Sequence, residues 1–97
     1  MSRYTTRVEL HAGTSEDYET LHSAMEGEGF SRTITAGDGL EYYLPTAEYN
    51  YDGTATRDAV FEAAKRAAAQ TGNSYAALVT ESAGRTWFGL QPVKKTA

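Results

Sequence analysis

The order of strand-like and helix-like periodicity constrains the fold of this chain more than any other feature. Residues 4–11 alternate between a half-apolar face and a polar face, which is typical of a strand covered on one side only. Between residues 18 and 25, apolar side chains recur every three or four positions, which is typical of one face of a helix. Short strand-like segments and one more helix-like segment follow.

Capping residues mark both ends of the first helix. Thr14 with Asp17, or Ser15 alone, provides an N-cap, because these side chains accept hydrogen bonds from free backbone N–H groups. Gly29 followed by Phe30 predicts a Schellman-type end, in which glycine takes a left-handed conformation and the apolar residue packs back on the helix.

Turn residues divide the rest of the chain. Gly37-Asp38-Gly39 between segments 31–36 and 40–44 predicts a hairpin, since Asp-Gly is a strong turn signal. Residues 46–55 are polar and predict a loop with a turn at Asp52-Gly53. The remaining expected elements are a helix between Thr56 and Gly72 with a small-residue face, a strand at 75–81, a turn at 82–84 and a last strand at 85–90.

This order predicts an α+β fold. A ferredoxin-like βαββαβ sandwich with one extra C-terminal strand accommodates every segment, with both helices on one face of an antiparallel sheet. The chain has 97 residues, so we expect a single domain over 1–97, ordered from about residue 3 to 92 and ending in a short tail.

The small size and the aromatic side chains of the last strand predict a partner. Segment 85–90 carries Trp87 on one face and Phe88 on the other, which is a surplus of apolar surface. We therefore expect a homodimer formed through the open sheet face and the C-terminal strand, which pairs with the sheet edge of the partner. The alternative is that this strand only closes a hairpin with 75–81 in its own chain.

Composition excludes several classes of protein. The chain has no cysteine, which rules out disulfides, thiolate metal sites and a cysteine nucleophile. The net charge of −4 argues against a general nucleic-acid binder. No apolar run is long enough to span a membrane, and the N-terminus lacks the apolar region of a secretory signal, so we expect a cytoplasmic protein. No phosphate-binding glycine motif occurs, and we predict no cofactor.

Three stretches resemble a known family. They are VELHAGTSEDYETLHSAMEGEGF (8–30), EYYLPTAEYN (41–50) and VTESAGRTWFGL (79–90), and the likeness extends from about Tyr4 to Leu90. They resemble the GhoS-like antitoxins of type V toxin–antitoxin pairs, which are bacterial proteins. The resemblance implies an endoribonuclease acting on a toxin messenger RNA, and a ferredoxin-like fold similar to the small CRISPR-associated spacer-acquisition nuclease. Those relatives that cleave with metal place an aspartate at the end of the first strand, where this chain has Glu9 and His11.

Four side chains are candidates for catalysis of RNA cleavage. The reaction needs a base, an acid and positive charge at the phosphate, and Arg7, Glu9, His11 and Arg85 are the residue types that supply them. The alternative is a polar sheet face with an ion pair of Arg7 to Glu9 or Glu81. We predict no metal site, because a carboxylate pair of Glu9 and Glu81 is unspecific for magnesium.

His22 and the tyrosines each allow a structural and a functional interpretation. His22 lies on the apolar stripe of the first helix, which favours a packed, hydrogen-bonded histidine over a catalytic one. Tyrosines at 42, 43, 49 and 51 have rings that stack on single-stranded RNA bases, but half-buried positions at a sheet edge are the alternative. The two functions that remain are a GhoS-like endoribonuclease and a non-enzymatic dimeric ferredoxin-like binding module.

Overall fold

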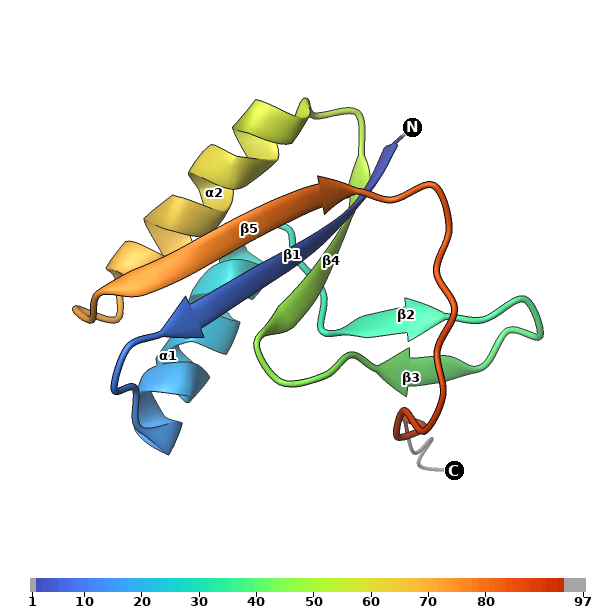
Figure 1. Cartoon of the computed structure of the whole chain (residues 1–97), viewed down its shortest axis with the longest axis horizontal. Helices are drawn as coiled ribbons and strands as arrows, with labels where there is room; N and C mark the ends of the chain where they lie inside the picture. The colour runs from blue at the N-terminus through green and yellow to red at the C-terminus, as the bar shows by residue number, and fades with distance from the viewer. Residues whose placement is uncertain (1, 94–97) are drawn as a thin grey trace.

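Two helices pack on one face of a three-stranded antiparallel sheet, and a short hairpin extends beside it (Figure 1). The structure, a computed structural model, describes residues 2–93. The α+β class is confirmed, and the arrangement is compatible with a ferredoxin-like fold. In chain order the elements are β1 (Ser2–Leu10), α1 (Ser15–Gly27), β2 (Thr33–Thr35), β3 (Glu41–Tyr43), β4 (Glu48–Gly53), α2 (Arg57–Ala69) and β5 (Tyr75–Glu81).

Strand β1 is the centre of the main sheet. The strand order is β4-β1-β5, with both neighbours antiparallel to β1, and β2 and β3 form a separate two-stranded sheet. An isolated bridge between Ser31 and Asn50 places the chain that enters β2 along the outer edge of β4. The hairpin therefore begins where a ferredoxin-like edge strand would lie and then extends away from the sheet.

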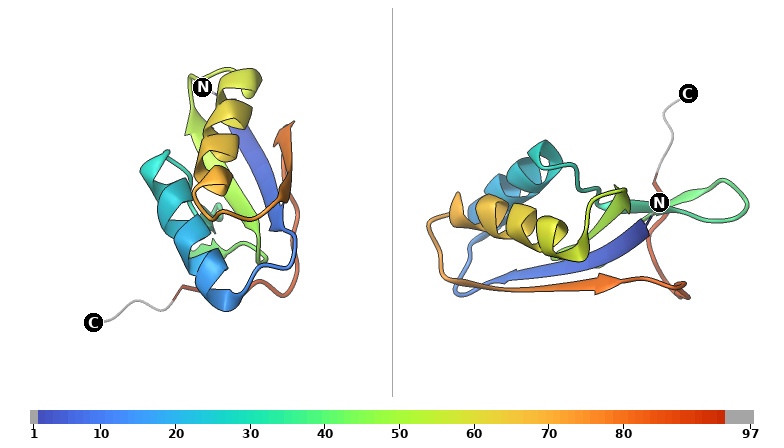
Figure 2. Two further views of the ribbon diagram at one scale, coloured as in Figure 1. Left: turned by 90° about the vertical axis from the view of Figure 1, so that its left-hand side faces the viewer. Right: turned by 90° about the horizontal axis from the view of Figure 1, so that it is seen from above.

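The core lies between the sheet and the helices. Figure 2 shows both helices on the same side of the sheet. Alternate residues of β1 point to that side because side chains of a strand alternate between faces, and the alanines of α2 allow the helix to approach closely. The buried cluster includes Tyr4, Val8, Leu10, Leu21, Met25, Phe30, Tyr49, Val60, Ala64, Ala67 and Ala68.

Both predicted ends of α1 are confirmed. Thr14 is the N-cap and forms a capping box with Asp17, with each side chain bonded to the backbone N–H of the other residue. At the other end Gly29 has a φ of +96°. The N–H of Phe30 donates to the carbonyl of Met25 at 3.0 Å, and this is the long bond of a Schellman end.

The prediction of a loop over residues 46–55 was wrong, because Glu48–Gly53 is strand β4. Tyr49 is buried beneath the helices, while Asn50 is buried on the opposite face. The amide of Asn50 is hydrogen-bonded to both Arg85 and Asp52, and those bonds offset the cost of burying a polar side chain in a strand.

The prediction of a last strand over residues 85–90 was also wrong. Residues 82–93, which we call the strap, have no strand and no helix. The strap crosses beside the open face of the sheet toward the hairpin (Figure 1). There the N–H of Tyr43 donates to the carbonyl of Gln91 at 2.9 Å and the N–H of Val93 to that of Glu41 at 3.0 Å. The last part of the strap thus bonds to β3 of its own chain, and it closes no hairpin with β5.

Neither helix in residues 2–93 is long and apolar enough to cross a membrane. The predicted C-terminal tail lies largely outside the described residues.

Candidate functional site

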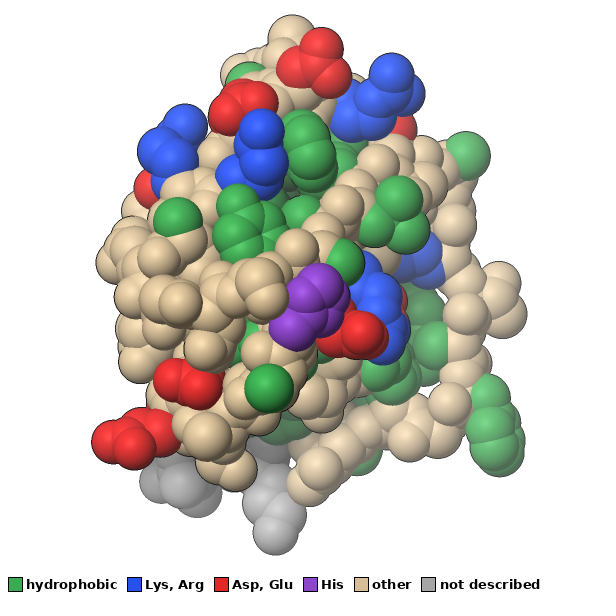
Figure 3. Space-filling view, turned by 60° about the vertical axis from the view of Figure 1, so that its left-hand side comes forward, with side chains coloured by type: hydrophobic (Ala, Val, Ile, Leu, Met, Phe, Trp, Pro, Cys, Tyr) green, Lys and Arg blue, Asp and Glu red, His purple; other side chains and the backbone are tan. Residues whose placement is uncertain are grey.

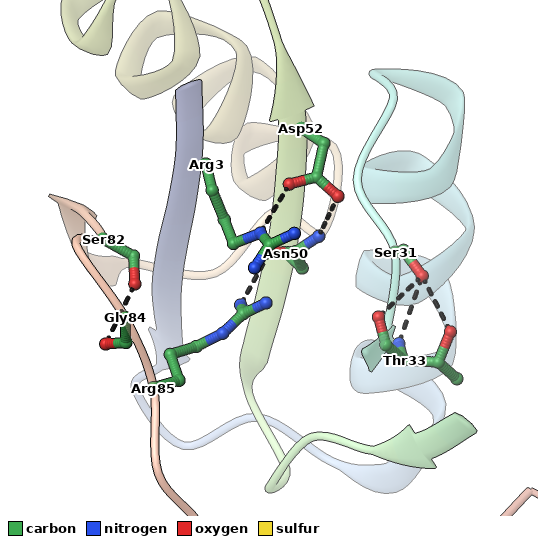
Figure 4. Close-up of polar contacts among 8 residues, drawn as sticks. All are labelled: Arg3, Ser31, Thr33, Asn50, Asp52, Ser82, Gly84 and Arg85. Carbon is green, nitrogen blue, oxygen red and sulfur yellow. Dashed lines mark hydrogen bonds and ion pairs between the residues drawn. The ribbon is translucent and has the colours of Figure 1, made fainter. Parts of the chain in front are cut away.

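The face of the sheet opposite the helices carries a chain of polar contacts that ends on the strap (Figure 4). Arg3 donates from Nε to Oδ1 of Asp52 at 3.0 Å, and Asn50 donates from Nδ2 to Oδ2 of the same carboxylate at 2.9 Å. Arg85 donates from Nη1 to Oδ1 of Asn50 at 2.7 Å. These hydrogen bonds attach the beginning of the strap to β4.

Burial opposes the charge on both Asp52 and Arg85, the two groups hydrogen-bonded to Asn50, but the net effect on the charged form differs. Burial opposes the charge on Asp52, but hydrogen bonds from Arg3 and Asn50 and the charges of both arginines outweigh it and keep the pKa of this carboxyl below its usual value. Burial lowers the pKa of Arg85, nearby Arg3 lowers it further, and Asp52 opposes the change. The guanidinium nevertheless stays charged near neutral pH.

A hollow beside the strap brings two arginines together. This open-face hollow has a volume of about 510 Å³. Arg7 reaches it from β1 and Arg85 from the strap, so two guanidiniums that lie far apart in the sequence share one concave surface. The lining residues are Thr5, Arg7, Glu48, Leu78, Thr80, Glu81, Ser82, Ala83, Gly84 and Arg85.

Arg7 is held loosely by two carboxylates. Its guanidinium lies 3.2 Å from Oε2 of Glu9 and 3.7 Å from Oε2 of Glu48. The ion pair with Glu9 that we gave as the structural alternative is therefore present. The Arg7 side chain is 50% exposed, and exposed pairs of this kind contribute only about 0–1 kcal/mol. An incoming anion can displace them at little cost.

A second nitrogen of the Arg85 guanidinium, Nε, is buried and has no hydrogen-bond partner among the described residues. A buried donor of this kind is costly when it stays unsatisfied.

His11 does not join the arginines. It follows the end of β1, four positions from Arg7, which is about 13 Å along a strand. There its Nδ1 lies 3.3 Å from Oγ of Ser74. Of the four predicted catalytic residues, the structure brings Arg7, Glu9 and Arg85 to one region and leaves His11 at the far end of the strand.

Glu48 is the site residue that the sequence interpretation missed. It lies opposite Arg7 in the register of β1 and β4, lines the hollow and is mostly covered, with 25% of its side chain exposed. A strand interpretation of residues 48–53 would have placed it beside Arg7. The polar loop that we predicted there gave no reason to pair the two.

No metal centre is formed by the described residues. No group of three or more His, Cys, Asp or Glu side chains gathers within residues 2–93. Glu81 lies opposite Tyr4 in the sheet, whereas Glu9 lies opposite Ala76, and five positions along a strand separate the two carboxylates by about 16 Å. The magnesium pair considered from the sequence is therefore not assembled within one chain.

His22 and Tyr49 have the structural role rather than the functional one. Nδ1 of His22 lies 2.6 Å from the hydroxyl oxygen of Tyr49, and both residues are buried. Tyr51 packs on the core, and Tyr42 packs near Trp87 with ring centroids 6.0 Å apart. Tyr43 is the most exposed of the four tyrosines singled out in the sequence.

A second hollow lies between the strap and the hairpin. This strap pocket has a volume of about 320 Å³, and its apolar wall consists of Ile34, Leu44, Pro45, Trp87, Phe88 and Leu90. Phe88 is 99% exposed, so its ring is presented to solvent at the rim. Large exposed aromatic side chains beside a concave surface are typical of binding sites.

One side of the molecule carries charged side chains of both signs. Figure 3 shows acidic and basic side chains interspersed around exposed hydrophobic ones, with no continuous basic area on this side. A nucleic acid that approached this side would meet no broad positive surface.

A scan against protein-family models, a search of curated proteins and a search of solved structures each gave no match.

Proposed function

We propose that the protein acts on RNA and that the open-face hollow receives a phosphodiester. The observation that supports this most is that Arg7 and Arg85, from opposite ends of the chain, line the same hollow. The resemblance to the GhoS-like antitoxins supports the same substrate and implies that the RNA is a toxin message. A guanidinium pair suits a phosphate because its N–H groups match the oxygens in geometry and charge.

The residues of the hollow suggest how cleavage would proceed. Glu48 accepts the proton of the ribose 2′-hydroxyl, whose oxygen then attacks the phosphorus to form a 2′,3′-cyclic phosphate. The bond from phosphorus to the 5′-oxygen breaks, and this oxygen takes a proton from water. Arg7 and Arg85 stabilise the added negative charge in the transition state. Glu48, which was not among the residues predicted from the sequence, takes the role of base because it lies beside Arg7.

The test is cleavage of a labelled, mixed-sequence single-stranded RNA, with and without EDTA. We expect wild type to cut the RNA in both conditions, because these roles use side chains alone. Arg7→Ala and Glu48→Gln should each lower the rate about 100-fold or more, as expected for loss of a base or of charge stabilisation. Arg57→Ala removes an equal charge from the exposed start of α2 and should leave the rate unchanged.

Two outcomes would overturn the proposal. The first is no cleavage by wild type, and the second is equal cleavage by wild type and Arg7→Ala. Melting temperatures of all variants establish that each is folded.

The strap pocket favours a second candidate function. Its apolar wall and the exposed Phe88 suit an apolar side chain of a protein partner, so the protein would be a non-enzymatic binding module. This candidate requires that wild type leave RNA intact. The homodimer also remains a prediction. Because no strand forms at residues 85–90, its interface would have to use another edge of the sheet.

A further inference from the structure

Within residues 2–93, the outer edge of β5 presents a row of backbone groups without partners. In this part of the chain β5 pairs only with β1. The bonds from His11 N–H to the Ser74 carbonyl (2.9 Å) and from Ser82 N–H to the Arg3 carbonyl (2.8 Å) show that even-numbered residues face β1. Because backbone groups of an antiparallel strand alternate in direction, the outward groups belong to the odd-numbered residues, which are Tyr75, Ala77, Val79 and Glu81.

This edge has none of the usual protection against pairing. Residues 75–80 carry no charge and no proline, whereas exposed edge strands are normally blocked by lysine, proline, a bulge or a covering segment. Figure 2 shows β5 as the outermost strand of the sheet, with no helix or strand of the described residues beyond it. Leu78, at the middle of the strand, is 63% exposed on the open face.

We propose that two copies of this chain pair antiparallel through β5, with the two-fold axis between Leu78 and the partner's Leu78. In this register Tyr75 lies opposite the partner's Glu81, and Ala77 opposite the partner's Val79. Every outward N–H and carbonyl of the strand is then used, which gives about eight hydrogen bonds by the antiparallel pattern. An axis at Ala77 or Val79 leaves one residue of each strand unpaired and gives about six.

The same register buries the exposed leucine. Leu78 and the partner's Leu78 form a non-hydrogen-bonded pair, in which side chains approach most closely. The axis is perpendicular to the sheet, so both open-face hollows lie on one side of a continuous six-stranded sheet. Arg7 is opposite Leu78 in its own sheet, so the two copies of Arg7 lie in one row, about 14 Å apart across three strand spacings.

Cysteine cross-linking tests the register directly, since the wild-type chain has no cysteine. Leu78→Cys should form a covalent dimer on mild oxidation, because the expected Cα separation of about 4.5 Å suits a disulfide. Thr80→Cys is on the same face of the same strand but lies about 13 Å from its own copy in the dimer, and should not cross-link. A mixture of Ala76→Cys and Thr80→Cys should cross-link, since these positions face each other.

Sedimentation tests dimer formation without a cross-linking reaction. Wild type should sediment as a dimer at micromolar concentration. Leu78→Lys, which places two like charges at the axis, should sediment as a monomer, whereas Thr80→Lys should stay dimeric. A monomeric wild type, a dimeric Leu78→Lys, or cross-linking of Thr80→Cys alone as fast as Leu78→Cys would overturn the proposal. None of these results depends on RNA cleavage, so this proposal and the proposed function can fail separately.

Discussion

The buried histidine of α1 makes the stability of this protein depend on pH. Burial lowers the pKa of His22 below 6.5, and the charge of Arg32 lowers it further, while Glu19 and Glu26 oppose the change in part. The unfolded chain therefore binds a proton that the folded chain does not. The free energy of unfolding is at its full value above about pH 6.5 and falls as the pH drops through the folded pKa, by less than about 1.4 kcal/mol per pH unit.

Urea denaturation measures this dependence at about pH 7.5 and about pH 5.5. We expect His11→Gln to keep the difference between the two values, because His11 is exposed. His22→Phe should reduce that difference, since the titrating group is gone. An unchanged difference in His22→Phe would show that other groups cause the pH dependence.

At the scale of a single element, the stability of helix α1 depends on its N-terminal capping residue. Thr14→Ala removes the oxygen that accepts from the N–H of Asp17 at 3.1 Å and should lower the free energy of unfolding by about 1 kcal/mol. Ser15→Ala is the matched control, because its hydroxyl takes no part in the capping box, and it should change stability by less than about 0.5 kcal/mol. Equal losses in the two variants would contradict the assignment of Thr14 as the N-cap.

The elements that the sequence predicted well are those with local signals. The ends of α1 could be predicted because Thr14, Asp17, Gly29 and Phe30 all act within a few residues of the helix. Strand β4 could not be predicted in this way, because asparagine is typical of a turn unless its side-chain amide is hydrogen-bonded. The amide of Asn50 accepts from Arg85 at 2.7 Å, and Arg85 lies on a distant part of the chain.

The residues of the candidate site could likewise be predicted only where the signal was local. Arg7 and Glu9 are two positions apart in a strand that was correctly predicted, so their side chains share a face. Glu48 required the correct register of β4 against β1. His11 was expected near the arginines because it belongs to the same segment, but a strand is straight and carries it away from them.

At the scale of the whole molecule, the strap joins the main sheet to the hairpin, which also meet at the bridge between Ser31 and Asn50. Its beginning attaches to the sheet through Arg85 and Asn50. Its middle places Trp87 beside Tyr42, and its end bonds to β3. One contact at the sheet therefore influences the surroundings of an aromatic side chain at the hairpin.

Asn50→Ala should reveal this connection. The substitution leaves a partly buried guanidinium without its acceptor, which costs about 1.5–3 kcal/mol when it stays unsatisfied, so the strap should detach from the sheet and expose Trp87. Because Trp87 is the one tryptophan of the chain, its fluorescence reports on the strap alone, and its emission should move to longer wavelength. Asn73→Ala, in the turn before β5 and away from the strap, should leave the emission unchanged. If Asn50→Ala stays folded with the emission of wild type, the bonds to β3 hold the strap without Arg85, and the strap and sheet are independent.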